Sequence, residues 1–319
     1  MRVLVTGATG FVGRPLLVAL QAAEHEVHAA VRRPPRLPLP AGIEVVPAPD
    51  LGETGDWRTV LDGVDAVVHL AGIAHVGADI AEARYDLVNH QASAALALAA
   101  VQAGIGRFVF VSSIRAQCRP VATHPLSEGD PPRPTDAYGR SKLAAEADIL
   151  ASGIGATILR PVAMYGPGMK GNFDTLARLA RLPVPLPFGS LRNRRSLLSV
   201  AAMADAVVFT LETAATIGGT YIVADAVPVT LVDIIAALRS AAGRPRRLFH
   251  LPAAVFRTAA RLIGRSDLWD RLDGELIASP ARLAAFGWRP EPDTCAALAR
   301  AVHLFQSERL AFQKGPGAA

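Results

Sequence analysis

The glycine-rich segment 6-TGATGFVG-13 constrains the fold of this chain more than any other feature. It directly follows an apolar run, 2-RVLVT-6, and directly opens a helical pattern. A strand, a glycine turn and a helix in this order form a dinucleotide-binding unit. Gly7 permits the tight turn, Gly10 lets backbone N–H groups approach a pyrophosphate, and Gly13 lets the helix pack close to the sheet. The segment therefore predicts a nucleotide site at the N-terminus of the first helix.

The first half of the chain continues the same alternation of strands and helices. Apolar, β-branched runs typical of strands occupy residues 2–6, 26–32, 43–48, 65–71, 107–113 and 156–161. Helical patterns lie between them, near residues 11–23, 56–62, 81–103 and 136–152. Strands that alternate with helices and are apolar on both faces predict a parallel sheet covered on both sides. The fold class we expect is α/β, a Rossmann-type doubly wound parallel sheet.

The rhythm changes after about residue 165. The Pro-rich loop 183-PVPLPFG-189 separates shorter elements, with helical patterns near 201–213, 230–241 and 252–264. We expect a dinucleotide-binding Rossmann domain over residues 1–165, with later segments as candidates to complete its sheet. A smaller, interleaved C-terminal substrate-binding region would span 166–312, and residues 313–319 would form a flexible tail.

Composition excludes several classes of protein. The net charge is +5 without a dense Lys/Arg run, which favours small anionic ligands over nucleic acid. The two cysteines, Cys118 and Cys295, belong to no C-x-x-C pair, so neither a disulfide framework nor a metal knuckle is indicated. The apolar run 92–104 is shorter than the roughly 20 residues of a membrane span. The chain opens directly with a strand, so we expect no signal peptide and a cytoplasmic location.

The helical pattern 253-AAVFRTAARLIGR-265 permits two interpretations. Arg257, Arg261 and Arg265 form one stripe, and apolar residues that include Val255 and Phe256 form the other. Such a helix can lie on a membrane surface. It can also be a half-buried helix with a solvated basic face, and the sequence favours this second interpretation.

The end of the second strand bears on the choice of cofactor. An acid is expected there to bind the ribose 2′-hydroxyl of NAD, but Val31 stands in its place, followed by Arg32 and Arg33. Guanidinium groups bind phosphate in a bidentate way, so the pair favours the 2′-phosphate of NADP; a solvated loop is the alternative. Asp50, after the third strand, can accept a hydrogen bond from an adenine amino group or simply cap a turn.

A candidate acid/base pair begins the helix at 136–152. Tyr138 and Lys142 are four residues apart, so they share one helix face. A nearby ammonium lowers the pKa of a phenol, so we expect the pKa of Tyr138 to be lowered and its side chain to serve as general acid/base. Ser112 and Ser113 end a strand at its carboxyl end, where open α/β sheets bind ligands, so either could orient a substrate hydroxyl.

Together these motifs carry a family resemblance. The matching segments are 6-TGATGFVG-13, 69-HLAG-72, Asn89, 110-FVSS-113, 138-YGRSK-142, 159-LRPVAMYGPG-168 and 194-RRSLLSV-200. With these segments in this order, the chain resembles an extended short-chain dehydrogenase/reductase of the NAD-dependent epimerase/dehydratase family. This group contains UDP-glucose 4-epimerase. The resemblance implies a catalytic triad of Ser113, Tyr138 and Lys142, in which the lysine also holds the nicotinamide ribose. It also places Arg195 against a substrate diphosphate and Asn172 near the nucleotide.

The motifs and the resemblance define the candidate site. The cofactor-binding candidates are Gly7, Thr9, Gly10, Phe11, Val12, Gly13, Arg32, Arg33, Asp50, Leu51, Leu70, Ala71, Gly72, Asn89, Tyr138, Lys142 and Pro161. The substrate-binding candidates are His75, Ser113, Arg115, Asn172 and Arg195. No metal site is expected, because His69 and His75 have no further ligand cluster near them in the sequence.

The chain departs from the family pattern at a few positions. Ala163 replaces an asparagine that is common there, and Gln117 and Cys118 replace the Tyr-Gly that usually follows the serine motif. The Asp-Glu pair of the 4,6-dehydratase branch is also absent, since Ile114 and Arg115 follow Ser113. Dehydration therefore has no evident catalyst.

Three functional hypotheses follow. The first is a nucleotide-sugar 4-epimerase, acting on a UDP-sugar through a transient keto-sugar and a bound NAD or NADP. The second is a one-way NADP-dependent reductase of a keto-sugar or another carbonyl, and the third a non-catalytic NADP-binding regulator. The resemblance also implies a homodimer that pairs through the helices at 81–103 and 136–152.

Overall fold

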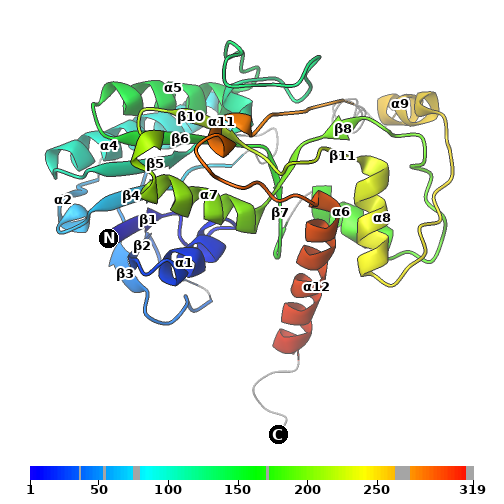
Figure 1. The fold of residues 1–319 in the computed structure, drawn as a ribbon, viewed down its shortest axis with the longest axis horizontal. Coiled ribbons are helices and arrows are strands. Elements are labelled where there is room, and N and C mark those ends of the chain that lie inside the picture. Colours follow the sequence, from blue (N-terminus) through cyan, green and yellow to red (C-terminus); the bar gives the residue numbers. More distant parts are fainter. Residues whose placement is uncertain (36, 53–54, 75–79, 170–171, 263–273, 314–319) are drawn as a thin grey trace, which may run out of the picture.

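A seven-stranded parallel sheet forms the centre of the molecule (Figure 1). The structure, a computed structural model, describes residues 1–35, 37–52, 55–74, 80–169, 172–262 and 274–313. The strands are β1 (Arg2–Thr6), β2 (Glu26–Val31), β3 (Glu44–Pro47), β4 (Ala66–His69), β5 (Arg107–Val111), β6 (Ala156–Pro161) and β10 (Thr220–Val223). Their order is β10-β6-β5-β4-β1-β2-β3, so the connection reverses between β1 and β4. The expected fold class is confirmed, and the reversal marks the crevice where such sheets bind nucleotides.

Helices cover both faces of the sheet. On one face lie α1 (Gly13–Ala22) and α7 (Val200–Glu212), and on the other α2 (Arg58–Leu61), α4 (Ala92–Gln102) and α5 (Ala137–Ala151). Successive residues of a strand point to opposite faces, so Val3 and Val5 pack with α1 and α7 while Leu4 packs with α2, α4 and α5. All three are fully buried, and each such side chain stabilises the fold by roughly 1.5–3 kcal/mol.

The predicted helix at 81–103 consists of three segments. It begins as α3 (Glu82–Tyr85), widens into the π-helical turn η1 (Asp86–Gln91) and continues as α4. A π-helical turn inside an α-helix is rare and is frequently found at functional sites. Here the turn carries Asn89, which is fully buried.

The second lobe contains most of the remaining elements (Figure 1). Its strands are β7 (Ala163–Tyr165) paired with β9 (Leu197–Ser199), and β8 (Arg194–Arg195) paired with β11 (Val229–Thr230). Its helices are α6 (Asn172–Ala180), α8 (Leu231–Ala241), α9 (Ala253–Leu262) and α12 (Thr294–Gln313). The short helices are η2 (Ile114–Ala116), η3 (Ala214–Thr216) and α11 (Ala281–Ala284).

The chain returns from this lobe to the sheet. Helix α7 packs on the face of the sheet that α1 also covers. β10 then pairs with β6 as the seventh strand of the sheet. The division of the chain near residue 165 into two domains remains our proposal. Residues 314–319 of the predicted tail lie outside the described residues, and Gln313 ends α12. None of the helices in the described ranges has the length and apolarity needed to cross a membrane.

Candidate active site

A cavity of about 850 Å³ lies at the carboxyl ends of β1 to β4. Ten of the predicted cofactor-binding residues line it: Gly7, Thr9, Gly10, Arg32, Arg33, Asp50, Leu51, Leu70, Ala71 and Gly72. Residues that the sequence did not indicate also line it, among them Thr6, Arg14, Trp57, Ile73 and Arg84. Ile73 adjoins a predicted residue, whereas Arg84 comes from a distant helix and carries no signal in the sequence.

The glycine turn forms the floor of this cavity. Gly7 has φ +70°, and a Cβ on it would lie 2.8 Å from the backbone nitrogen of Ala71. A Cβ on Gly13 would lie 2.3 Å from the carbonyl oxygen of Gly7. Both positions therefore require glycine, and the turn keeps its backbone open at the start of α1. This backbone cradle fits the pyrophosphate of a dinucleotide.

A buried hydrogen-bond chain supports the opposite wall, residues 71–73. Burial lowers the pKa of His69 to about 3, so the imidazole is neutral. Ser93 donates to the carbonyl oxygen of Asn89 (2.7 Å), and it therefore accepts from Nε2 of His69 (2.8 Å). Nδ1 of His69 then accepts from Thr6 (2.7 Å), whose hydroxyl oxygen accepts from the backbone N–H of Ala71 (3.2 Å). His69 is thus a structural link between the wall and the helix behind it.

Asn89 holds the same wall from the helix side. Its Oδ1 accepts from the N–H of Ile73 (2.7 Å), and its Nδ2 donates to the carbonyl oxygen of Ile73 (3.0 Å). Nδ2 also lies 3.3 Å from Oγ of Ser141 in α5. The predicted contact of Asn89 with the cofactor remains a prediction, because the polar atoms of this side chain already hold the cavity wall.

Arginines surround the end of the cavity near β2 and β3. Arg32 donates to Asp50, with 3.0 Å between Nη1 and Oδ2, and Asp50 also accepts from the N–H of Gly52 (2.9 Å). These contacts, the backbone one first, lower the pKa of Asp50. Asp50 therefore caps a turn, one of its two predicted roles. With Arg33 and Arg84 also lining the cavity, this end suits an anionic group.

The triad residues come from two adjacent elements. Ser113 follows β5 and caps η2, and its Oγ accepts from the N–H of Arg115 (3.2 Å). Tyr138 lies in the first turn of α5, which Asp136 caps by accepting from the N–H of Gly139 (2.7 Å). A side-chain hydrogen bond joins Ser113 and Tyr138. The two side chains thus lie together, as the predicted triad requires, and their catalytic roles remain a prediction.

Lys142 faces the cavity wall. Its Nζ donates to the carbonyl oxygen of Val111 (3.1 Å) and lies 4.6 Å from the ring centroid of Phe110. A Cβ on Gly72 would lie 3.7 Å from Nζ, so the ammonium stands beside the loop that lines the cavity. Burial lowers the pKa of Lys142 to about 8, against the opposing effect of Glu146. The lysine remains mostly protonated at pH 7.

The sequence predicts a lowered pKa for Tyr138, and for the protein alone this prediction is wrong. Burial raises the pKa of Tyr138, and the electrostatic effects of Asp136 and of the neighbouring Tyr85 phenol act in the same direction. The hydrogen bond with Ser113 and the charge of Arg115 oppose them without prevailing. Helix periodicity predicts that Tyr138 and Lys142 share a face, but it does not reveal how deeply the phenol is buried.

A buried ion pair lies behind the triad, and the sequence did not reveal it. Nε of Arg160 in β6 donates to Oε1 and Oε2 of Glu146 in α5, at 3.0 and 3.2 Å. Ser112 donates to Glu146, and Arg160 donates to Oε1 of Gln117 (3.0 Å). Gln117, one of the departures from the family pattern, therefore completes the hydrogen bonding of a buried guanidinium. This cluster fixes α5 against β6 and against Ser112, the residue before Ser113.

The predicted substrate residues have different surroundings. Arg115 pairs with Asp136, and Nη1 of Arg115 is buried without a hydrogen-bond partner among the described residues. Nη2 of Arg195 is likewise buried without one in the described part of the chain, and burial lowers the pKa of this residue. Asn172 begins α6, but the structure does not describe its side chain. His75 lies outside the described residues.

Seven cofactor candidates do not line the cavity: Phe11, Val12, Gly13, Asn89, Tyr138, Lys142 and Pro161. Phe11 instead packs against the core of the second lobe. A Cβ on Gly166 would lie 3.5 Å from its ring. Their contacts with a cofactor remain predictions.

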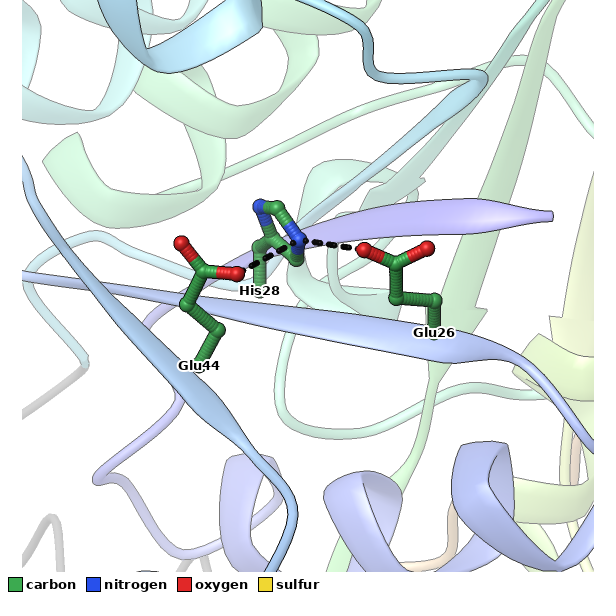
Figure 2. A group of neighbouring side chains, drawn as sticks. All are labelled: Glu26, His28 and Glu44. Carbon is green, nitrogen blue, oxygen red and sulfur yellow. Dashed lines mark hydrogen bonds and ion pairs between the residues drawn. The ribbon is translucent and has the colours of Figure 1, made fainter.

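One histidine–carboxylate cluster lies on the outer part of β2 and β3 (Figure 2). Nε2 of His28 lies 3.1 Å from Glu26 and 3.3 Å from Glu44. Arg2 also donates to Glu26, with 2.8 Å between Nε and Oε1. The guanidinium already supplies a positive charge to this cluster, which we interpret as an ion-pair network.

Comparison with known proteins defines the family. The family model for the NAD dependent epimerase/dehydratase family matches residues 3–224. The chain belongs to this family. It is 33% identical over 300 residues to UDP-glucose 4-epimerase of Vibrio cholerae, covering 90% of each chain. It is 32% identical over 273 residues to ceramide reductase of Caulobacter vibrioides, covering 85% of this chain and 78% of the relative.

Solved structures agree with this assignment. MoeE5, in complex with UDP-glucose and NAD, superposes with a TM-score of 0.76 and 25% identity, covering 97% of this chain and all of that one. The protein is therefore an enzyme of the extended short-chain dehydrogenase/reductase type that uses NAD or NADP. A non-catalytic regulator does not fit a family of enzymes with the serine–tyrosine pair in place.

Proposed function

We propose that this enzyme is a UDP-sugar 4-epimerase. The observation that carries the proposal is the pairing of Ser113 with Tyr138, one turn before Lys142, beside a cavity with the glycine cradle of a dinucleotide site. Likeness to UDP-glucose 4-epimerase over 90% of both chains supports the sugar substrate. The triad supports the proposed reaction class, and the relatives support the proposed sugar substrate.

The triad residues would divide the proton chemistry between them. A bound nicotinamide cofactor supplies the acceptor and donor for the C4 hydride. Ser113 orients the C4 oxygen, and Tyr138 removes its proton and later returns one to the keto-sugar oxygen. Because burial raises the pKa of Tyr138, its neutral form predominates and suits the protonation of the keto-sugar. The ammonium of Lys142 holds the ribose side of the site beside Gly72.

Arg195 would bind the diphosphate of the substrate. Its backbone is fixed on both sides, since β8 pairs with β11 and Arg195 also bridges to Leu276. Nη2 is buried without a hydrogen-bond partner among the described residues. A buried donor without an acceptor is costly, and a diphosphate oxygen would satisfy it with a charge-assisted hydrogen bond.

A one-way NADP-dependent reductase is the second candidate. Arg32 and Arg33 line the cavity where an acid would favour NAD, and Arg84 adds a third guanidinium. Ceramide reductase, a relative named as a reductase, matches 85% of the chain. This alternative keeps the same triad but releases oxidised cofactor after every turnover.

We also propose that the enzyme is a homodimer. Helices α4 and α5 lie side by side and leave an apolar face in solvent, with Leu98, Val101 and Leu150 each 39–52% exposed. Two small residues, Ala95 of α4 and Ala147 of α5, are exposed as well. A second copy of this two-helix face would cover these side chains and remove the exposed patch.

The epimerase proposal is tested by offering UDP-glucose to the purified enzyme without added cofactor. We expect the 4-epimer to form, as followed by proton NMR, with NAD or NADP co-purifying with the protein. Tyr138→Phe is the matched control and should keep the cofactor while losing turnover by about 10²-fold or more. Stoichiometric NADPH oxidation with a keto-substrate, and no epimer from UDP-glucose or its N-acetyl relative, would favour the reductase.

A further inference from the structure

The positive charge of the chain is concentrated in two segments. Residues 178–192 and 239–262 contain nine arginines and neither aspartate nor glutamate. The whole chain has 33 basic and 28 acidic residues. Outside these two segments there remain 24 basic and 28 acidic residues, so that part of the chain is net acidic. The net charge of +5 therefore resides in these two segments, which we call the basic tip.

The fold joins the two segments into one surface at the outer end of the second lobe. Leu186 donates its N–H to the carbonyl oxygen of Arg247 (3.1 Å), and Phe249 donates to that of Leu186 (3.0 Å). The buried Arg239 ties the same loops by donating to the carbonyl oxygens of Pro245 (2.7 Å) and Val184 (3.2 Å). Of the nine arginines only Arg239 is buried, and the other eight are exposed.

Helix α9 completes the tip and lies at the edge of the molecule (Figure 1). It is anchored by Phe256, whose ring stacks on Phe188 with 5.8 Å between centroids. Val255 was predicted to face inward with Phe256, but it is 47% exposed because the two neighbours point about 100° apart on a helix. Leu262, seven residues on and on the same side of the helix as Val255, is 82% exposed. Arg257 and Arg261 are also exposed, on a separate stripe of the helix.

Apolar side chains accompany the arginines elsewhere on the tip. Leu182, Val184 and Phe249 are each 43–50% exposed. The tip thus holds five of the sixteen exposed large apolar side chains among the described residues, in about an eighth of the chain. Single exposed apolar residues need no explanation, but a group of them among arginines marks an interaction surface.

We propose that the basic tip docks on the surface of an anionic lipid bilayer. Arginines would contact lipid phosphates, while Val255, Phe249 and Leu262 would enter the boundary between headgroups and acyl chains. The charge of the tip is complementary to that surface, and the remainder of the molecule, being net acidic, would be held away from it. A nucleic acid would bind the arginines equally well but would leave the aliphatic side chains in water, so lipid accounts for more of the surface.

Vesicle co-sedimentation of the full chain tests the proposal. We expect binding to phosphatidylcholine vesicles that contain phosphatidylglycerol, weakening with salt, and none to phosphatidylcholine alone. The double variants Arg257→Glu/Arg261→Glu and Val255→Ser/Leu262→Ser should each weaken binding by about tenfold or more. Both should keep the cofactor affinity of the wild type, because none of the four residues lines the cavity.

Matched controls change the same kinds of residue elsewhere. Arg58→Glu/Arg289→Glu reverses two exposed charges, and Val18→Ser removes an exposed apolar side chain; both should bind vesicles as the wild type does. The proposal is overturned if the wild type does not bind anionic vesicles, or if the tip variants bind no worse than these controls. It is also overturned if Val255→Ser/Leu262→Ser binds normally while the wild type binds duplex DNA as tightly as lipid, since the tip would then be a general polyanion site.

Discussion

Arg160 and Glu146 form an ion pair that is almost completely buried, with Nε of the arginine 3.0 Å from Oε1 of the glutamate. The pair joins β6 to α5 directly behind Ser113, Tyr138 and Lys142. Every group around it is hydrogen-bonded, with Ser112 donating to the carboxylate and Gln117 accepting from the guanidinium. This arrangement avoids the cost of burying isolated charges.

Breaking this pair should destabilise the enzyme strongly. Arg160→Met leaves the Glu146 carboxylate buried without its main partner, so we expect a loss of about 3–5 kcal/mol in the free energy of unfolding. Urea denaturation measures it. The double variant Glu146→Leu/Arg160→Met removes both charges and should recover most of the loss. If the single variant costs less than the double one, the pair does not act as described.

Asp225 should make stability depend on pH. It is buried beneath Tyr165, whose hydroxyl donates to Oδ2 (2.7 Å), and burial raises the pKa of Asp225 to about 6. In the unfolded chain the value is near 3.8. The folded state therefore binds the proton more tightly, so this contribution is present at low pH and is lost as pH rises through 6. Between about pH 4 and 7 it should fall by about 2 kcal/mol.

Asp225→Asn isolates this effect, because an amide cannot ionise. As pH rises from 4 to 7, the unfolding free energy of the wild type should fall relative to that of the variant. Urea denaturation at several pH values measures it. A difference that is flat, or that grows with pH, contradicts the raised pKa.

The arginines that follow β2 should bind the 2′-phosphate on the ribose of NADP. Arg32→Ala/Arg33→Ala removes two guanidinium groups from the cavity and should weaken NADP more than NAD, by about tenfold or more. Titrating both cofactors by protein fluorescence gives the ratio. Arg58→Ala, which changes an exposed arginine outside the cavity, should leave both affinities unchanged. Equal losses for the two cofactors would show that Arg32 and Arg33 do not bind a 2′-phosphate.

The apolar face of α4 and α5 should determine the oligomeric state. Leu98→Arg/Leu150→Arg places two charges on that face, and desolvating them would oppose pairing. We expect the wild type to sediment as a dimer and this variant as a monomer in analytical ultracentrifugation. Val18→Arg, on the exposed side of α1, is the control and should remain dimeric. A wild type that is monomeric at high concentration contradicts the proposed contact.

The sequence predicts the local features of this enzyme well. The six strands from β1 to β6 are largely apolar runs, and the glycine turn and the Tyr138–Lys142 spacing depend only on neighbouring residues. Features that depend on distant segments were missed. Later segments were candidates to complete the sheet, but the sequence did not single out β10, a four-residue strand that pairs with β6 more than fifty residues earlier in the chain.

The same limit applies to the site. Gln117 is a departure from the family pattern in the sequence, but its role appears only when Arg160 from β6 lies beside it. Arg84 comes to the cavity from the helix after β4, and no motif marks it. The raised pKa of Tyr138 depends on burial by several elements, which helix spacing does not report.

The fate of the hydride at C4 distinguishes the proposed epimerase from a reductase. An epimerase returns the hydride to the sugar from which it came, whereas a reductase passes it to a different molecule. We would incubate the enzyme with UDP-glucose that carries deuterium at C4 and follow the products by NMR and mass spectrometry. We expect UDP-galactose that retains deuterium at C4, with no net change in nicotinamide absorbance and almost no product from Tyr138→Phe. Deuterium released into free nicotinamide cofactor, with no 4-epimer formed, would contradict the proposed epimerase.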